Sequence, residues 1–166
     1  MTSTQISKRK FRKVDPQIWN DAKFNSMTPC GKLSLLFLLT HPNMTSIGAM
    51  RATKIGLASE LGIDPKEFDE PFAKGIAKAC QEENVIWLPN FIKYNPPENP
   101  NVVTSWVKSL ECLPEGDTKK TIISKIINYL KTGFQDSFSK AFTEGLGKGL
   151  SKGFNQGYSK TVSSEQ

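Results

Sequence analysis

The sequence predicts a mainly α-helical protein with a small β element, arranged as a winged helix-turn-helix with additional C-terminal helices and a flexible repeat tail. Two short apolar helices are expected on either side of a glycine turn at residues 61–64. A β-branched and aromatic segment follows at residues 85–88. Two helices joined by such a turn are typical of a helix-turn-helix, and a strand directly after it is what a winged helix requires.

Helix starts are indicated by a capping residue followed by proline. Asp15-Pro16, Thr28-Pro29 and Asp64-Pro65 each place an N-cap side chain before a proline at the first helical position. Thr53 is expected to cap a further short helix, which Gly62 ends. Residues 33–39 are apolar on most sides, which predicts a central buried helix.

The next segment is expected to contain one helix and then extended chain. Phe68, Phe72, Ile76 and Cys80 recur every fourth residue, which predicts a helix over residues 65–80. A strand is predicted at residues 85–88, a short strand near Ile47, and extended chain at residues 91–94. The wing is expected to be short, because only residues 81–84 separate helix from strand.

Two more helices are predicted after the proline-rich residues 95–101. Apolar residues recur at helical spacing from Val102 to Leu110, and again after Asp117 or Thr118, with Ile122 to Leu130 as the apolar face. Residues 133–160 are seven four-residue units, each with an apolar second residue. Four residues overshoot a helical turn by about 40°. We therefore expect the last helix to continue to about Glu144 and then to fray.

The predicted organisation is a disordered basic arm (1–14), a winged-helix domain with a helical extension (15–132) and a repeat tail (133–166). The tail is either a flexible extension or a segment for self-association or partner docking. Alternating lysines and aromatics would also suit weak contact with single-stranded nucleic acid.

Composition argues against several classes of protein. The longest apolar run is far shorter than the roughly 20 residues that span a bilayer, and no signal peptide is recognised. The three cysteines form no CxxC pair, and the single histidine cannot supply a zinc site. No phosphate-binding or metalloprotease motif is present. We expect a cytoplasmic protein with reduced thiols that is not an enzyme, uses no metal or other cofactor and does not bind membranes.

The net charge of +6 is unevenly distributed. Residues 1–14 carry five basic side chains and no acid, whereas residues 61–84 carry six acids and three lysines. A basic arm commonly binds nucleic acid, although a solvated, disordered leader has the same composition. The predicted nucleic-acid-binding residues are Lys8, Arg9, Lys10, Arg12, Lys13, Arg51, Lys54, Lys66, Lys74, Lys78 and Lys93.

Three stretches resemble a family of phage and prophage replication-associated proteins with an N-terminal winged helix. They are Arg-Lys-Val-Asp-Pro-Gln-Ile-Trp-Asn-Asp at 12–21, Leu-Ser-Leu-Leu-Phe-Leu-Leu-Thr-His-Pro at 33–42, and the segment from Trp87 to Trp106. Some relatives also carry a glycine-phenylalanine repeat. The resemblance implies a role like that of replisome organisers or initiators, which bind origin DNA and recruit a helicase or its loader.

One feature departs from that pattern. The second helix of the motif carries Glu67, Asp69 and Glu70, and carboxylates facing phosphates reduce affinity. The basic arm, with Arg51, Lys54 and Lys93, is therefore the better candidate for phosphate contacts. Two other functions remain open: a winged-helix transcriptional regulator, and a protein–protein adaptor without direct DNA binding.

Overall fold

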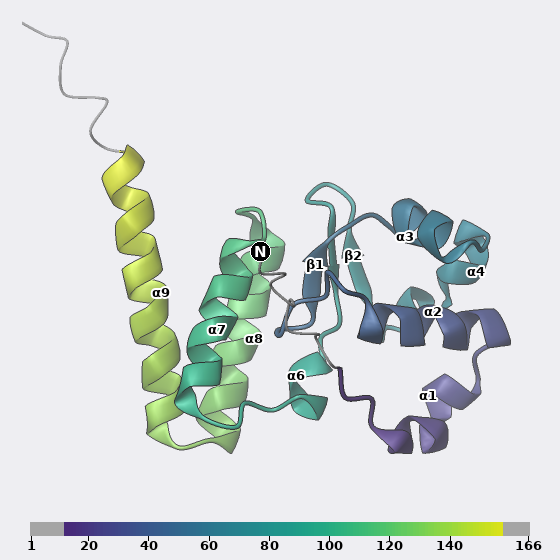
Figure 1. Ribbon diagram of the computed structural model, residues 1–166, viewed down its shortest axis with the longest axis horizontal. Coiled ribbons are helices and arrows are strands. Elements are labelled where there is room, and N and C mark those ends of the chain that lie inside the picture. The colour runs from purple at the N-terminus through teal and green to yellow at the C-terminus, as the bar shows by residue number, and fades with distance from the viewer. Residues whose placement is uncertain (1–11, 158–166) are drawn as a thin grey trace, which may run out of the picture.

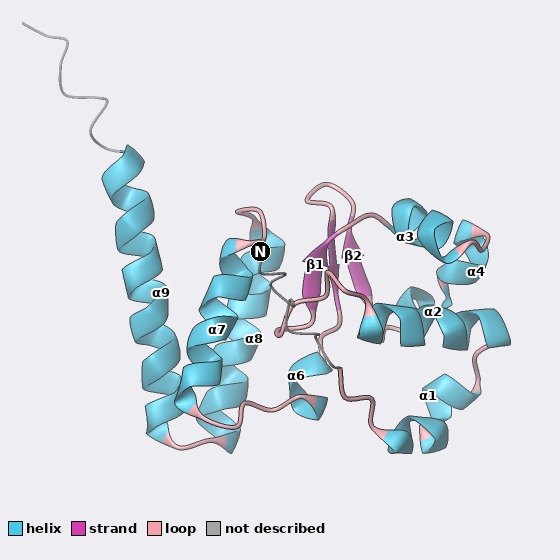
Figure 2. Ribbon diagram, viewed as in Figure 1, coloured by secondary structure: helices cyan, strands magenta, loops and turns pink. Residues whose placement is uncertain are grey.

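The computed structural model describes residues 12–157, with side chains described as far as residue 148. The helical elements are η1 (Pro16–Asn20, a 3-10 helix), α1 (Ala22–Asn25), α2 (Pro29–Thr40), α3 (Lys54–Leu61), α4 (Pro65–Phe68), α5 (Glu70–Ala73), α6 (Phe91–Tyr94), α7 (Pro100–Glu111), α8 (Asp117–Gly133) and α9 (Asp136–Gly157). The strands are β1 (Ala49–Arg51), β2 (Lys78–Cys80) and β3 (Val85–Trp87). The prediction of a mainly helical protein with a small β element is confirmed, as Figure 2 shows.

The helix starts lie where the capping residues predict them. Asp15 accepts a hydrogen bond from the N–H of Gln17, and Thr28, Thr53 and Asp64 each accept one from a backbone N–H of the helix that they begin. These side chains satisfy donors that have no partner inside the helix. Gly62 closes α3 with a φ of 77°, in the left-handed region that glycine adopts readily.

A three-stranded antiparallel sheet lies at the centre of the molecule, with β3 between β1 and β2. Met50 pairs with Ile86, and Ala49 pairs with Trp87. Because alternate side chains point to opposite faces, Met50 and Ile86 pack against α2–α5, whereas Ala49 and Trp87 pack against α7 and α8. Figure 1 shows these layers, with α9 outermost beside α7.

The prediction of one helix over residues 65–80 is wrong. The segment forms α4, then α5, and ends in strand β2. Asp69 lies between the two helices, and Pro71, which has no backbone N–H, occupies the first turn of α5. Gly75 then reverses the chain with a φ of 69°. Apolar residues recur every fourth position as far as Cys80, but pairing of β2 with β3 determines the backbone conformation there.

Two extended segments also differ from expectation. The first strand is β1 at Ala49–Arg51, just after the position expected near Ile47. Residues 91–94 form the single turn α6 and are not extended. This turn lets the consecutive side chains of Phe91 and Ile92 bury themselves in different apolar clusters, one on each side of the sheet.

The C-terminal helix does not run through to Glu144 as predicted. Helix α8 ends at Gly133. After Phe134 and Gln135 the chain reverses direction, and α9 packs along α7. Tyr129, Phe134 and Phe138 stack in sequence at the corner, with ring centroids 5.2 and 5.1 Å apart. The return buries Phe142 completely, whereas a continuous helix would carry it away from the core. Helix α9 continues past Glu144 to Gly157, and the remaining tail, 158–166, lies outside the described residues.

Candidate nucleic-acid interface

The described part of the basic arm is attached to the fold. Lys8, Arg9 and Lys10 lie outside the described residues. The Arg12 guanidinium donates a hydrogen bond to the carbonyl of Met44 and lies 6.0 Å from the centroid of the Phe91 ring. Burial lowers the pKa of Arg12. Arg12 therefore anchors the arm, and only Lys13, which is paired with Glu98 at 3.5 Å, is a solvated charge of the kind expected.

The two helices of the predicted helix-turn-helix correspond to α3 and to the segment α4–α5, and we call them the helix pair. Their lysines are largely paired with acids. Lys54 forms a salt bridge with Asp69. Lys74 lies 4.0 Å from Glu70, one helical turn before it. Lys66 is exposed on α4, and no carboxylate of residues 12–148 lies within ion-pair distance of it. Of these three predicted site residues, only Lys66 can therefore meet a phosphate without first leaving a carboxylate partner.

The acids of the helix pair have structural partners. Asp64 caps α4, and Asp69 pairs with Lys54. Glu70 turns inward and accepts hydrogen bonds at Oε2 from the N–H of Thr28, at 3.0 Å, and from its hydroxyl, at 2.7 Å. The acidity of this segment thus helps to hold α5 against the start of α2. Residues 54–74 carry five acids and three lysines and so offer DNA no net positive charge.

The hairpin that joins β2 to β3 is fastened to α8. Its Glu83 carboxylate accepts a hydrogen bond at Oε1 from the N–H of Thr118, at 3.4 Å. Gly116 leaves room for this carboxylate, since a Cβ there would lie 2.2 Å from Oε1. A negative charge at a helix N-terminus is favourable because the peptide dipoles point their positive end at it. The short hairpin therefore packs on the protein itself.

Replacing Glu83 with glutamine is expected to lower the free energy of unfolding by about 1 kcal/mol, because it removes a partly buried charge from a helix N-terminus. Urea denaturation measures the change. Glu82→Gln, an exposed change in the same hairpin, is the matched control and should be nearly neutral. Equal destabilisation of the two variants would show that docking on α8 does not depend on the Glu83 charge.

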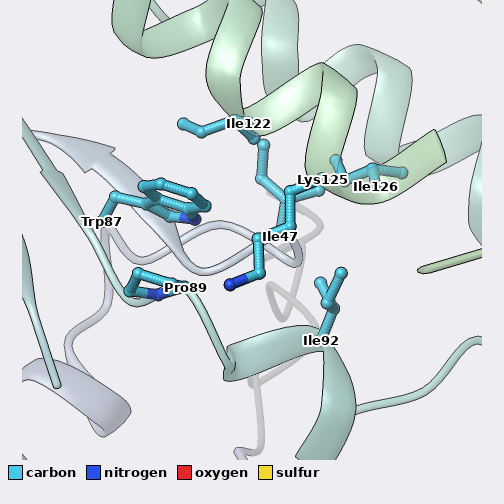
Figure 3. Close-up of a pocket in the computed structure, with 7 residues that line it drawn as sticks. All are labelled: Ile47, Trp87, Pro89, Ile92, Ile122, Lys125 and Ile126. Atoms are coloured by element: carbon cyan, nitrogen blue, oxygen red, sulfur yellow. The ribbon is translucent and has the colours of Figure 1, made fainter. Parts of the chain in front are cut away.

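Two lysines meet beside Trp87 on the α8 side of the sheet, and a third lies near enough to affect one of them. The ammonium of Lys78, in β2, lies 5.8 Å from the centroid of the indole, and that of Lys125, in α8, lies 5.6 Å from it. Burial lowers the pKa of Lys125, and the neighbouring charges of Lys93 and Lys78 lower it further. Lys93, in α6, is therefore the third member of the group. We call Lys78, Lys93 and Lys125 the lysine triad. Figure 3 shows Lys125 extending from α8 toward Trp87 and Pro89.

Sequence reasoning identified Lys78 and Lys93 but missed Lys125. Lys125 is one of several lysines on α8, and its neighbour Ile126 belongs to the buried face of that helix. Its place beside an apolar face is visible in the sequence, but its contact with Trp87, 38 residues earlier, is not. Arg51, the remaining predicted residue, is exposed at the end of β1 and pairs in register with Val85.

Besides the lysines, the chain has one histidine and three cysteines among its candidate functional side chains. His41 is buried at the end of α2, with Nε2 3.2 Å from Glu60 and Nδ1 accepting a hydrogen bond from the N–H of Asn43. Cys30, Cys80 and Cys112 are unbridged. Over the described residues, no cluster of acids, histidines and cysteines is suited to a metal ion, and no helix has the length and apolarity to cross a membrane.

Comparisons with known protein families, curated proteins and solved structures find no match to this chain.

Proposed function

We propose that this protein binds DNA through a winged-helix module and its basic N-terminal arm, in phage-type replication in the cytoplasm. The observation that carries the proposal is the order of elements around the sheet. Helix α2, β1, α3, the α4–α5 pair, β2, a short hairpin and β3 follow one another, with β3 central. A winged helix-turn-helix requires this order, and the module commonly serves to bind DNA.

The cations that lack an acidic partner favour contact with the phosphate backbone over base reading. Arg51, Lys66 and the lysine triad have no carboxylate partner among the described residues. Lysine is a point charge that suits phosphate, whereas the fork of arginine suits paired contacts with guanine. Binding is therefore expected to be salt-dependent and weakly specific.

The replication role, including recruitment of a helicase or its loader, rests on the resemblance of residues 12–21, 33–42 and 87–106 to replication-associated proteins, and residues 87–106 are the distinctive segment among them. Trp87 and Trp106, at the two ends of that segment, are both buried in the cluster between the sheet and α7–α8. The segment thus joins the sheet to the helical layer. Its two tryptophans support packing, whereas Lys93, within the same segment, is one of the proposed DNA contacts.

Deleting residues 1–11 is expected to weaken binding to duplex DNA and to lower the slope of log affinity against log salt by about 0.9 for each phosphate that the arm neutralises. The deletion removes Lys8, Arg9 and Lys10 but keeps the Arg12 anchor. Fluorescence anisotropy on duplex and single-stranded DNA at several salt concentrations measures the change. A full-length chain with no salt-dependent DNA binding would contradict the proposal.

Exposed apolar side chains support a second candidate, a protein–protein adaptor. Trp19 is 60% exposed and Ile55 is 71% exposed, on η1 and α3 of the same half of the molecule. An adaptor would retain a purified partner after nuclease treatment, and Ile55→Ser would abolish that retention. A transcriptional regulator would instead prefer one operator and bind it as a dimer with spaced half-sites.

A further inference from the structure

The lysine triad concentrates positive charge from three separate elements. Lys78 comes from the edge strand β2, Lys93 from α6 and Lys125 from α8, so the folding of the whole chain brings them together. Lys78 is opposite Trp87 in the register of β2 and β3, and Lys125 reaches the same indole from the other layer. Trp87 itself is only 6% exposed. The buried ring is a fixed support on which two ammonium groups rest.

This gathering of like charges has no counter-ion within the described protein. None of the three ammonium groups forms a salt bridge with a carboxylate of residues 12–148. Asp117, which lines the same groove as Lys78, pairs with Lys120 at 3.0 Å, and Glu83 accepts a hydrogen bond from the N–H of Thr118. Repulsion among neighbouring cations opposes folding, and a bound anion relieves it.

The surface beside Lys78 and Trp87 is hollow on one side. A groove of about 260 Å³ lies between β2–β3 and the first turns of α8, and Lys78, Trp87, Asp117, Thr118 and Thr121 are among the residues that line it. The opposite side of Trp87 is closed by Ile47, Ile92, Ile122 and Ile126, which hold the indole in place (Figure 3). Of the three cations, Lys78 lines the open groove, and Lys125 reaches the same indole from the closed side.

We propose that Lys78, Lys93 and Lys125 form a binding site for the phosphates of a nucleic-acid backbone. The inference deepens the proposed DNA binding and rests on it. It locates the contact on the face of the sheet that α8 covers, whereas the helix-turn-helix pair packs on the opposite face. Three cations from separate elements suit successive phosphates along a strand, and a triad of lysines alone, without arginine or amide groups, favours phosphate contact over base recognition.

The ion pairs of the helix pair explain why the contact would lie here. Lys54 and Lys74 must give up Asp69 and Glu70 to reach a phosphate, and Glu70 also holds the start of α2. The triad has no such carboxylate partner among residues 12–148. Since an ion pair that must be broken offsets much of the new contact, unpaired lysines give the larger gain in affinity.

The test compares two full-length triple variants with the wild type. The variant K78Q/K93Q/K125Q removes the triad, and K108Q/K131Q/K148Q removes the same charge from exposed positions on α7, α8 and α9. The first is expected to bind duplex DNA roughly tenfold to a hundredfold more weakly near 0.15 M salt and to lower the salt slope by about 2.7. The second should bind like the wild type. K78R/K93R/K125R keeps the charge and should retain the slope.

Two further results distinguish failure of the triad site from failure of the proposed DNA binding. Lys93→Gln changes an exposed side chain, so it should leave thermal unfolding unchanged while lowering the salt slope by about 0.9. Wild-type binding with unchanged slopes in both the triple and the Lys93 variant would overturn the triad site and leave DNA binding intact. Absence of wild-type binding to duplex or single-stranded DNA would overturn the proposed function as well.

Discussion

Replacing Gly48 with alanine is expected to destabilise the protein by about 3 to 5 kcal/mol, the sum of left-handed strain and overpacking. Gly48 has a φ of 74°, and a Cβ there would lie 2.2 Å from Cβ of Phe91 and 3.1 Å from the carbonyl oxygen of Leu88. Neither neighbour has room to move: Phe91 is buried, and the N–H of Leu88 donates to the carbonyl of Gly48 at 2.8 Å. Backbone and side chain would both have to shift.

The matched control is Gly62→Ala. Gly62 has almost the same φ, 77°, but nothing lies within 4 Å of a Cβ placed there. Its substitution is expected to cost about 1 kcal/mol, from the left-handed conformation alone. Urea denaturation of both variants separates backbone strain from the clash with Phe91. Similar destabilisation of the two would mean that α6 moves away at little cost.

The Gly48 result also bears on the candidate interface. Phe91 begins α6, which carries Lys93, and the Arg12 guanidinium lies over the Phe91 ring. A residue at position 48 that displaces α6 would therefore disturb the arm anchor and one member of the triad together. Because Gly48 has no Cβ, the loop before β1 can contact α6 at this position.

Local chemistry made much of the helical structure predictable. The capping side chains of Asp15, Thr28, Thr53 and Asp64 satisfy backbone donors within three residues of their own position. Such contacts depend on neighbouring sequence and little else. The start of α8 has no side-chain cap, and the apolar faces of α7 and α8 were predictable from the helical spacing of their apolar residues.

The secondary-structure predictions are wrong where pairing with another segment of the chain determines the backbone conformation. Cys80 continues a helical pattern in the sequence, but its backbone pairs with Val85 in the sheet. Residues 91–94 have the aromatic and β-branched character of a strand, but no neighbouring strand lies there to pair with them within the described structure. Apolar spacing reports which residues are buried more reliably than it reports the backbone that buries them.

Only part of the candidate site could be predicted from the sequence. Charge counting found Lys78 and Lys93 as well as Lys54 and Lys74, and ranked Lys54 and Lys93 above the two lysines of the acidic segment. Ion pairs with Asp69 and Glu70 separate the second two from the first two, and those pairs depend on how the helices pack. Lys125 joins the triad only because α8 crosses the sheet at Trp87. Sequence supplies the charges, and the fold decides which of them remain unpaired.

Replacing Phe142 with alanine is expected to cost about 3 to 5 kcal/mol, the usual range for removing a fully buried phenylalanine. The four-residue repeat presents Phe134, Phe138, Phe142 and Leu146 as equivalents. In the structure only Phe142 of these four is completely buried, in the cluster that contains Trp106 and Val107. The four-residue period overshoots a helical turn, so one unit faces α7 squarely and its neighbours lie to either side.

Two controls test that explanation. Phe138→Ala removes an equivalent residue from a half-buried position and should cost clearly less, and Thr143→Ala changes an exposed neighbour on the same helix and should be nearly neutral. Thermal and urea unfolding measure the three variants. If Phe138 and Phe142 contributed equally, the repeat would pack as a uniform stripe and α9 would have no preferred register on α7. A large excess at Phe142 would instead mean that one repeat unit fixes the register. The close approach of Gly145 to Val107, where a Cβ would lie 2.9 Å from Cγ2, opposes sliding of α9 in one direction, because a shift of one unit that way would place Ala141 at that contact.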